Sequence, residues 1–229
     1  MVFIGRIPDP QTANLALASQ GRALGGGLRL LNVGGGDKHA PLPPHYAGWE
    51  HCLLDVVPGP DVDVVLDPRR LASLEPEQFD AVYCAHVLER HHPHDIPKIL
   101  AGLVHVLKPE GYVEIRTPDV MTVIKTVVIN RMEPDDVLYT SNAVPISAHD
   151  VIYGWGEAIA TVGPERYAHK RGFSVRSLTA SLDRAGFAKV WELITESRYE
   201  IRALAFKSEP SPKQEAFLGP LKRPPYPSA

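Results

Sequence analysis

The stretch Leu28-Arg-Leu-Leu-Asn-Val-Gly-Gly-Gly36 decides the fold. Its short apolar run is typical of a strand that is buried in a parallel sheet, and three glycines follow where the strand ends. Glycines at such a strand end allow backbone N–H groups to approach a ligand closely. The triplet alone leaves two interpretations open, a ligand-binding loop or a simple tight turn.

Apolar runs of the same kind follow the triplet. They predict strands at 51–55, 63–67, 79–84 and 111–116, with a helical pattern at 96–107 before the last of these. Alternating strands and helices imply right-handed crossovers and a parallel sheet covered on both faces. A capped helix at 174–186 precedes two strands, 188–194 and 199–206, whose short connection makes them antiparallel. We therefore expect an α/β fold with a doubly wound, seven-stranded sheet, mostly parallel, whose last strand is antiparallel.

Other segments depart from this alternation. A helix is predicted at 11–24, where three more glycines end it. Residues 117–172 start with a helical stretch but then show no clear period, so we expect an inserted cap after the fifth strand. Residues 1–207 would then form a single domain. The tail at 208–229 contains six prolines and is predicted to be extended or disordered.

Composition excludes several classes of protein. The chain has 229 residues, a net charge of -3, 44% hydrophobic residues and two cysteines, which argues against disorder and a disulfide scaffold. The mild acidity argues against a nucleic-acid partner, and no apolar run approaches the roughly 18 residues of a membrane helix. The start shows no signal-peptide pattern. We expect a cytoplasmic protein without a membrane partner, and the oligomeric state stays open.

Prolines also mark the first crossover. The chain contains 22 prolines, and Pro41, Pro43 and Pro44 stand directly after the glycine loop. Because proline removes a backbone N–H donor and interrupts helices, this connection is predicted to be short or irregular.

Two acids stand where predicted strands end. Asp55 follows the second strand, where a carboxylate can accept both hydroxyls of a ribose, and Asp67 follows the third. Capping or solvation of the strand ends is the alternative for both. A dinucleotide-binding loop wants Gly-x-Gly-x-x-Gly, but His39 occupies the place of the third glycine, which argues against a nicotinamide cofactor.

Several segments together resemble the class I S-adenosylmethionine-dependent methyltransferases, in particular the small bacterial "methyltransferase domain 11" type. The resemblance covers about residues 28–207, and its fold is Rossmann-like with a reversed seventh strand. The segments that carry it are Leu30-Leu-Asn-Val-Gly-Gly-Gly36, Leu53-Leu-Asp55, Val64-Val-Leu-Asp-Pro68, Phe79-Asp-Ala-Val-Tyr-Cys-Ala-His-Val-Leu-Glu89, Leu103-Val-His-Val-Leu-Lys-Pro-Glu-Gly-Tyr-Val113 and 173–187.

The resemblance implies an S-adenosylmethionine site. Gly34, Gly35 and Gly36 would wrap the methionine part, Asp55 would hold the ribose, and Asp67 with Pro68 would meet the adenine edge. Ala85 and His86 would line the other side of the cofactor. The remaining implied contacts are Asn32, Asp37 and Val56. Two residues depart from the family pattern: Asn32 stands where an acid is frequent, and Lys38 stands where a further glycine is common.

Candidate catalytic residues follow from the chemistry of methyl transfer. The reaction is an in-line displacement, so alignment matters most, and a base is needed only where the acceptor must lose a proton. His86 after the fourth strand is the first candidate, Asp119 after the fifth strand is the second, and His169 in the cap is the third. Each could instead be plain polar lining. The tetrapeptide Asn/Asp-Pro-Pro-Tyr/Phe is absent, and Cys84-Ala-His-Val87 stands in its place.

Two further clusters stand out. His91, His92 and His94 lie beside Glu89, but Pro93 interrupts any helix between them, so no metal site is expected. The run Tyr167-Ala-His-Lys-Arg-Gly-Phe173 combines aromatic and cationic side chains, and it could hold an anionic or sugar-like acceptor or be a solvated turn.

The hypothesis from the sequence is an S-adenosylmethionine-dependent methyltransferase. Its acceptor would be a small molecule or an exposed group of a larger one. A non-catalytic S-adenosylmethionine sensor or partner-binding module is the alternative. An NAD-dependent oxidoreductase is the third hypothesis.

Overall fold

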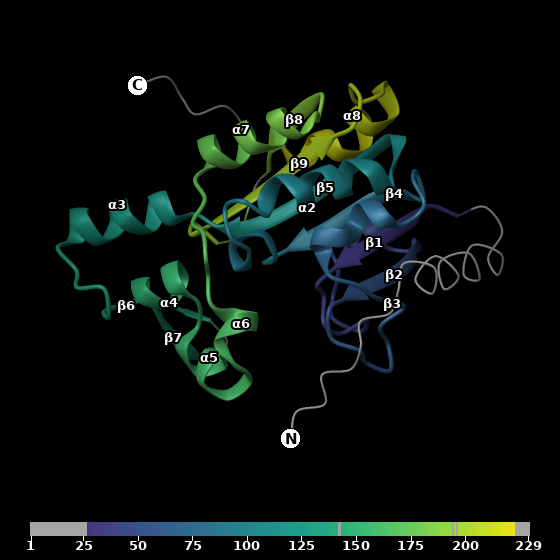
Figure 1. The fold of residues 1–229 in the computed structure, drawn as a ribbon. Coiled ribbons are helices and arrows are strands. Elements are labelled where there is room, and N and C mark those ends of the chain that lie inside the picture. The colour runs from purple at the N-terminus through teal and green to yellow at the C-terminus, as the bar shows by residue number, and fades with distance from the viewer. Residues whose placement is uncertain (1–26, 142, 194, 196, 223–229) are drawn as a thin grey trace.

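A seven-stranded sheet forms the centre of the computed structural model, which describes residues 27–141, 143–193, 195 and 197–222 (Figure 1). The strand order is β3-β2-β1-β4-β5-β9-β8. Six strands share one direction, and β9 runs antiparallel to both of its neighbours. This confirms the predicted sheet, whereas the helix predicted at 11–24 lies outside the described residues. The strands are β1 (Arg29–Val33), β2 (Glu50–Asp55), β3 (Val64–Val65), β4 (Phe79–Ala85), β5 (Leu107–Pro118), β8 (Lys189–Glu192) and β9 (Glu200–Phe206).

Helices α2 (Ile96–Val106) and α7 (Val175–Ala185) cover one face of the sheet. Helix α2 buries apolar residues at spacings of three and four, which gives it a single apolar stripe. Helix α7 begins with a capping box at Ser174 and ends at Gly186 in the left-handed conformation. Side chains on this face of the strands pack with both helices into the larger of the two cores that flank the sheet.

The opposite face of the sheet has different cover. Every residue between β1 and β2 is described, and their one helical element is the 3-10 turn η1 (Pro44–Tyr46), so the first crossover is irregular rather than a full helix, as predicted. Helix α8 (Pro212–Leu218) and the turn η4 (Gly219–Leu221) also lie on this side, where Leu218 is buried with Trp191 and Phe206.

Helix α8 corrects the prediction of an extended or disordered tail for its described part. Ser211 caps the helix: its hydroxyl accepts the N–H of Gln214, and the Gln214 side chain accepts the N–H of Ser211. Pro212 occupies the first helical turn, where no N–H donor is needed, so this proline favours a helix start. Burial of Leu218 then fixes the helix to the sheet.

The third strand is shorter than the predicted 63–67 because the acids at its ends have other partners. Asp63 accepts the backbone N–H of Leu53 and pairs with Lys38, while Asp67 caps the 3-10 turn η2 (Pro68–Ser73). Only Val64 and Val65 remain in the strand.

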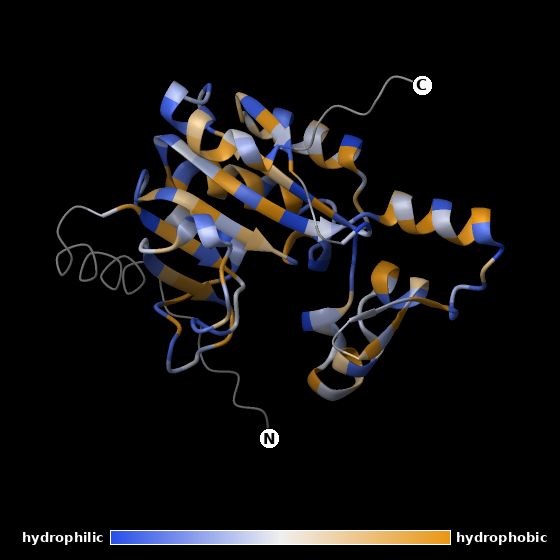
Figure 2. Ribbon diagram, turned by 180° about the vertical axis from the view of Figure 1, so that it is seen from behind, coloured by the Kyte–Doolittle hydropathy of each residue, from blue (hydrophilic) through white to orange (hydrophobic). Residues whose placement is uncertain are grey.

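Between β5 and α7 the chain leaves the sheet and builds a separate group of elements, at the side of the molecule that Figure 1 shows in teal and green. Val123, Ala148, Val151 and Tyr199 form its small core. In Figure 2 helix α3 shows orange, hydrophobic segments along its length. The elements are α3 (Val120–Asn130), β6 (Val137–Ser141), β7 (Val144–Ser147), α4 (Ala148–Tyr153), α5 (Gly156–Val162) and α6 (Pro164–Tyr167).

None of the helices in the described ranges has the length and apolar character that crossing a membrane requires.

Candidate functional site

A cavity of about 550 Å³ opens where β1 and β2 end, within the size range of small-molecule sites. It combines residues of the strand ends with residues of η3 (Leu88–Arg90) and of α6. Of the predicted cofactor contacts, seven line it: Gly34, Gly35, Gly36, Asp55, Val56, Asp67 and Pro68. The other lining residues are Val57, Arg69, Val87, Arg90, His91, His92, Asp95, Arg166, Tyr167 and Lys170.

The glycine loop brings bare backbone to the cavity wall. Gly34 and Gly36 have φ angles of +72° and +68°, in the left-handed region that glycine tolerates best. A Cβ atom on Gly34 would lie 2.7 Å from the Cγ2 atom of Val87, and one on Gly35 would collide with the amide of Asn32. Asn32 itself is buried beneath the loop, so its role is to support the loop.

Asp55 is the last residue of β2 and is held rigidly. One carboxylate oxygen accepts the N–H of Gly36 at 3.2 Å, and the other accepts the N–H of Val57 at 2.9 Å. The Arg166 guanidinium approaches the second oxygen at 3.7 Å. The carboxylate is therefore tied to the glycine loop on one side and faces a cation from α6 on the other.

Asp67 lines the cavity but is largely engaged by a neighbour. It caps η2 by accepting the backbone N–H of Arg69, and the Arg69 guanidinium also donates to both of its oxygens. Burial alone would raise the pKa of the Asp67 carboxyl, but the hydrogen bonds from Arg69 outweigh it and hold that pKa below its ordinary value. Asp67 is thus ionised and paired, and the buried Pro68 beside it also lines the cavity.

Besides Asn32, three predicted cofactor contacts do not line the cavity, although the structure describes all of them. Asp37 is exposed and accepts the N–H of His39, a contact within its own turn. Ala85 ends β4 and His86 follows it, but neither lines the cavity, although the next residue, Val87, does. Lys38 is also absent from the lining, because its ammonium pairs with Asp63 at 2.6 Å.

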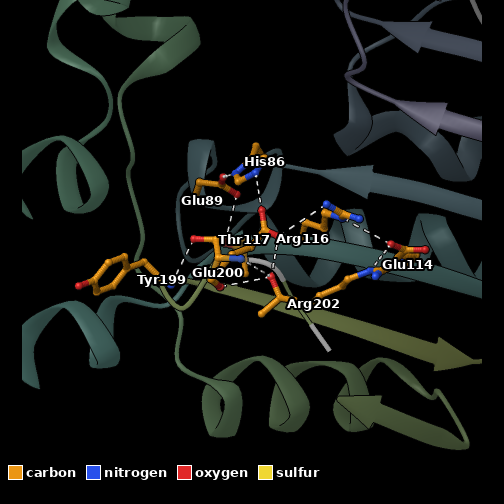
Figure 3. Close-up of polar contacts among 10 residues, drawn as sticks. His86, Glu89, Glu114, Arg116, Thr117, Tyr199, Glu200 and Arg202 are labelled. Carbon is orange, nitrogen blue, oxygen red and sulfur yellow. Dashed lines mark hydrogen bonds and ion pairs between the residues drawn. The ribbon is translucent and has the colours of Figure 1, made fainter. Parts of the chain in front are cut away.

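His86 is fixed between two carboxylates (Figure 3). Its Nδ1 lies 3.1 Å from Glu89 Oε1, and its Nε2 lies 3.0 Å from Glu200 Oε1. Burial would lower the pKa of His86, but the hydrogen bonds to Glu200 and Glu89 raise it to about 9. At neutral pH both ring nitrogens carry protons and donate them to these acids. This corrects the choice of His86 as the first candidate base, since an imidazolium has no lone pair to accept a proton.

The same contacts extend into a charged chain along β5 and β9 (Figure 3). Glu200 lies 3.7 Å from Arg116, and Glu114 accepts a hydrogen bond from Arg202 at 2.7 Å. Glu114 is fully buried and also contacts His45 at 2.9 Å. Burial would raise the pKa of Glu114, but the hydrogen bonds from His45 and Arg202 hold it below its ordinary value. Sequence reasoning missed this chain, although charges alternating with apolar residues at 113–116 and 200–203 were a signal for it.

Asp119 has a structural role. Its carboxylate accepts the backbone N–H groups of Met121 and Thr122 and the Thr122 hydroxyl at 2.6 Å. These contacts form the N-cap of α3. The second candidate base is therefore already saturated with donors.

His169 retains the state that a base requires. Its Nδ1 lies 3.0 Å from the carbonyl oxygen of Val151, so this nitrogen carries the proton and donates it. Burial is the largest influence on the imidazole and lowers the pKa of His169 below its ordinary value. The Nε2 atom is then an unprotonated acceptor at neutral pH. His169 itself does not line the cavity, but Tyr167 and Lys170 on either side of it do.

The predicted histidine cluster is spread over the cavity edge. His91 and His92 line the cavity, and His91 Nδ1 donates to the carbonyl of Val87 at 2.9 Å. His94 instead lies 3.5 Å from Asp95. Within the described residues, the one group with metal-like spacing is the exposed set Asp37, His39 and Asp61.

Comparison with known proteins gives one family and several structures. A family model described as "Methyltransferase domain" matches residues 9–192. No protein of the curated collection matches. One similar structure is that of 1,6-didemethyltoxoflavin-N1-methyltransferase from Burkholderia thailandensis, which contains bound 1,6-didemethyltoxoflavin and S-adenosylhomocysteine. The two sequences are 17% identical, the match covers 88% of this chain and 80% of that chain, and the TM-score is 0.50. A protein from Pyrococcus horikoshii OT3 is similar at 12% identity, 86% and 88% coverage and a TM-score of 0.51. At these identities the two structures show the fold.

Proposed function

The chain belongs to the methyltransferase domain family, and from this we propose that it transfers the methyl group of S-adenosylmethionine to a small molecule or an exposed polar group. One observation carries the proposal. The glycine loop and Asp55 lie together on one wall of a single cavity, at the carboxyl ends of parallel strands where open α/β sheets bind ligands.

The cavity fits this cofactor. A side chain at Gly34 or Gly35 would collide with Val87 or Asn32, so the loop can keep its close-packed path at the cavity wall only with glycines there. Asp55 offers carboxylate oxygens at the cavity wall, and a structure of the same fold, the Burkholderia enzyme, holds S-adenosylhomocysteine. When bound, S-adenosylmethionine supplies an electrophilic methyl group on a positively charged sulfur.

The lining residues then have distinct tasks. Gly34 to Gly36 hold the methionine part, Asp55 accepts the ribose hydroxyls, and Pro68 with the capped Asp67 meets the adenine edge. Val87 packs against the glycine loop and excludes water beside the methionine part. Tyr167 closes the side that faces away from the sheet. The protein's main contribution is the alignment of the acceptor with the methyl group.

An acceptor that loses a proton needs a base, and His169 fits that role best among the three candidates. Its Nε2 is unprotonated because its Nδ1 donates to Val151 and because burial disfavours the charged ring. It does not line the cavity itself, but Tyr167, two residues before it, and Lys170, directly after it, do.

Calorimetric titration of the wild-type protein with S-adenosylhomocysteine tests the proposal. We expect one site per chain. Turnover is then measured with methyl-labelled S-adenosylmethionine against a panel of hydroxyl, amine and thiol acceptors. The absence of binding would refute the proposed function, and binding without turnover on any acceptor would support the sensor instead.

A further inference from the structure

We propose that the methyl acceptor is an anionic small molecule, whose carboxylate or phosphate is held by Arg90 and Arg166 beside Tyr167. The inference deepens the proposed function and rests on it, because it places the acceptor in the cavity that would hold S-adenosylmethionine. All three residues line that cavity.

Arg90 supplies the first observation. It is the last residue of η3, and its guanidinium lies 5.0 Å from the centre of the Tyr167 ring. Its Nε atom is buried without a hydrogen-bond partner among the described residues. A buried guanidinium donor that lacks an acceptor is costly. The Nε atom itself is out of reach of a ligand, and Arg90 would meet an anion with the part of its side chain that lines the cavity.

Arg166 supplies the second observation from a segment that is remote in sequence. It belongs to α6, and its guanidinium lies 5.9 Å from the centre of the same ring. Its closest carboxylate is Asp55, at 3.7 Å, which is longer than a hydrogen bond. Two cations thus flank one aromatic ring and share a single nearby acid.

Charge balance in the cavity points the same way. The lining carries four formal positive charges, on Arg69, Arg90, Arg166 and Lys170, against three carboxylates, on Asp55, Asp67 and Asp95, which leaves one positive charge in excess. S-adenosylmethionine brings a net positive charge, since its ammonium and sulfonium outweigh its carboxylate. Even if that carboxylate contacts one arginine, the other remains. An anionic acceptor would balance the remaining charge in a cavity where like charges repel strongly.

The wall that carries these residues is held in place. The N–H of Lys170 donates to the carbonyl of Glu89 at 2.7 Å, and the N–H of His169 donates to the carbonyl of Tyr153 at 2.9 Å. Gly154 packs so closely on the Tyr167 carbonyl that any side chain would collide with it. The position of Tyr167 is therefore fixed before a ligand arrives, which lowers the entropic cost of binding.

The test uses protein saturated with S-adenosylhomocysteine. Benzoate and phenyl phosphate serve as anionic probes, benzamide serves as the neutral match of benzoate, and binding is followed by calorimetry. We expect both anions to bind more tightly than benzamide. Arg90→Gln and Arg166→Gln should each weaken anion binding about tenfold, the loss expected for one charge-assisted hydrogen bond. Arg176→Gln, which removes an exposed charge on α7 outside the cavity, should change nothing.

The outcomes separate this proposal from the proposed function. Equal binding of benzoate and benzamide to the saturated protein overturns the anionic acceptor and leaves the methyltransferase assignment intact. Loss of S-adenosylhomocysteine binding in both arginine variants, with anion binding kept, assigns the two arginines to the cofactor and also overturns it. If wild-type protein fails to bind S-adenosylhomocysteine, both proposals fail. Stronger binding of phenyl phosphate than benzoate identifies a phosphate as the recognised group, and the reverse identifies a carboxylate.

Discussion

Replacing Asp55 by asparagine should weaken S-adenosylhomocysteine binding far more than it weakens the fold. The substitution keeps the shape of the side chain at the end of β2 but removes its charge and turns one acceptor into a donor. In the protein each oxygen accepts one backbone N–H, from Gly36 at 3.2 Å and from Val57 at 2.9 Å. The amide can serve only one of these donors and leaves the other facing an NH₂ group.

Two free-energy changes follow. A hydrogen bond to a charged group contributes about 1.5–3 kcal/mol, against about 1 kcal/mol for a neutral pair, so the loss of charge at two ribose hydroxyls costs about 1–4 kcal/mol. That corresponds to roughly a 5- to 1000-fold rise in Kd. The unsatisfied backbone donor lowers stability by about 1 kcal/mol or more, which for a chain of this size lowers Tm by roughly 2–4 °C per kcal/mol.

Calorimetry with S-adenosylhomocysteine and thermal unfolding measure the two effects separately. Asp61→Asn is the matched control, because it removes an acid from an exposed position of the same connection without touching the cavity. A Tm that falls while Kd stays within about threefold of the wild type would refute the reasoning. Asp55 would then stabilise the glycine loop and nothing more.

Three further predictions concern the remaining polar residues. Since the folded pKa of His86 is raised from 6.5 to about 9, its stabilising effect is complete below pH 6.5 and is lost as pH rises through 9; His86→Asn should flatten Tm between pH 7 and 9.5. His169→Gln should lower kcat about 100-fold or more in methyl-transfer assays with a proton-losing acceptor, with an unchanged Kd for S-adenosylhomocysteine. Glu114→Leu should cost about 3–5 kcal/mol in urea unfolding, because it leaves the half-buried Arg202 and His45 without their carboxylate. Glu114→Leu with Arg202→Leu should recover part of that loss.

The sheet was predictable because its signals are local. Each predicted apolar run contains or overlaps a strand of the sheet, although the ends of β3 and β5 differ from the prediction. The glycine triplet after β1 indicates the left-handed backbone that Gly34 and Gly36 adopt. The tail was mispredicted for an equally local reason. Proline content suggested an extended chain, whereas the position of Pro212 directly after the capping residue Ser211 favours a helix start.

The acceptor side of the site was less predictable because it depends on long-range contacts. Arg166 reaches Asp55 across 111 positions of sequence, through the placement of α6. His86 was chosen as a base from its place after β4, but Glu200, which helps to keep it protonated, arrives 114 residues later through the pairing of β9 with β5. No short motif encodes either contact. They become visible only when the strand register is known.

The irregular first crossover and the buried carboxylate of Glu114 depend on each other. A full helix between β1 and β2 would lay apolar side chains over this face of β5, and Glu114 would lose its partners. Pro44 instead begins a single turn in which His45 reaches Glu114 at 2.9 Å and Tyr46 reaches it at 3.2 Å. Proline suits that position because its fixed φ starts the turn. Pro43, the residue before the turn, adopts the extended backbone that a residue preceding a proline prefers. The prolines after the glycine loop therefore keep a full helix out of the crossover, and a charged carboxylate is tolerated in the middle of the sheet.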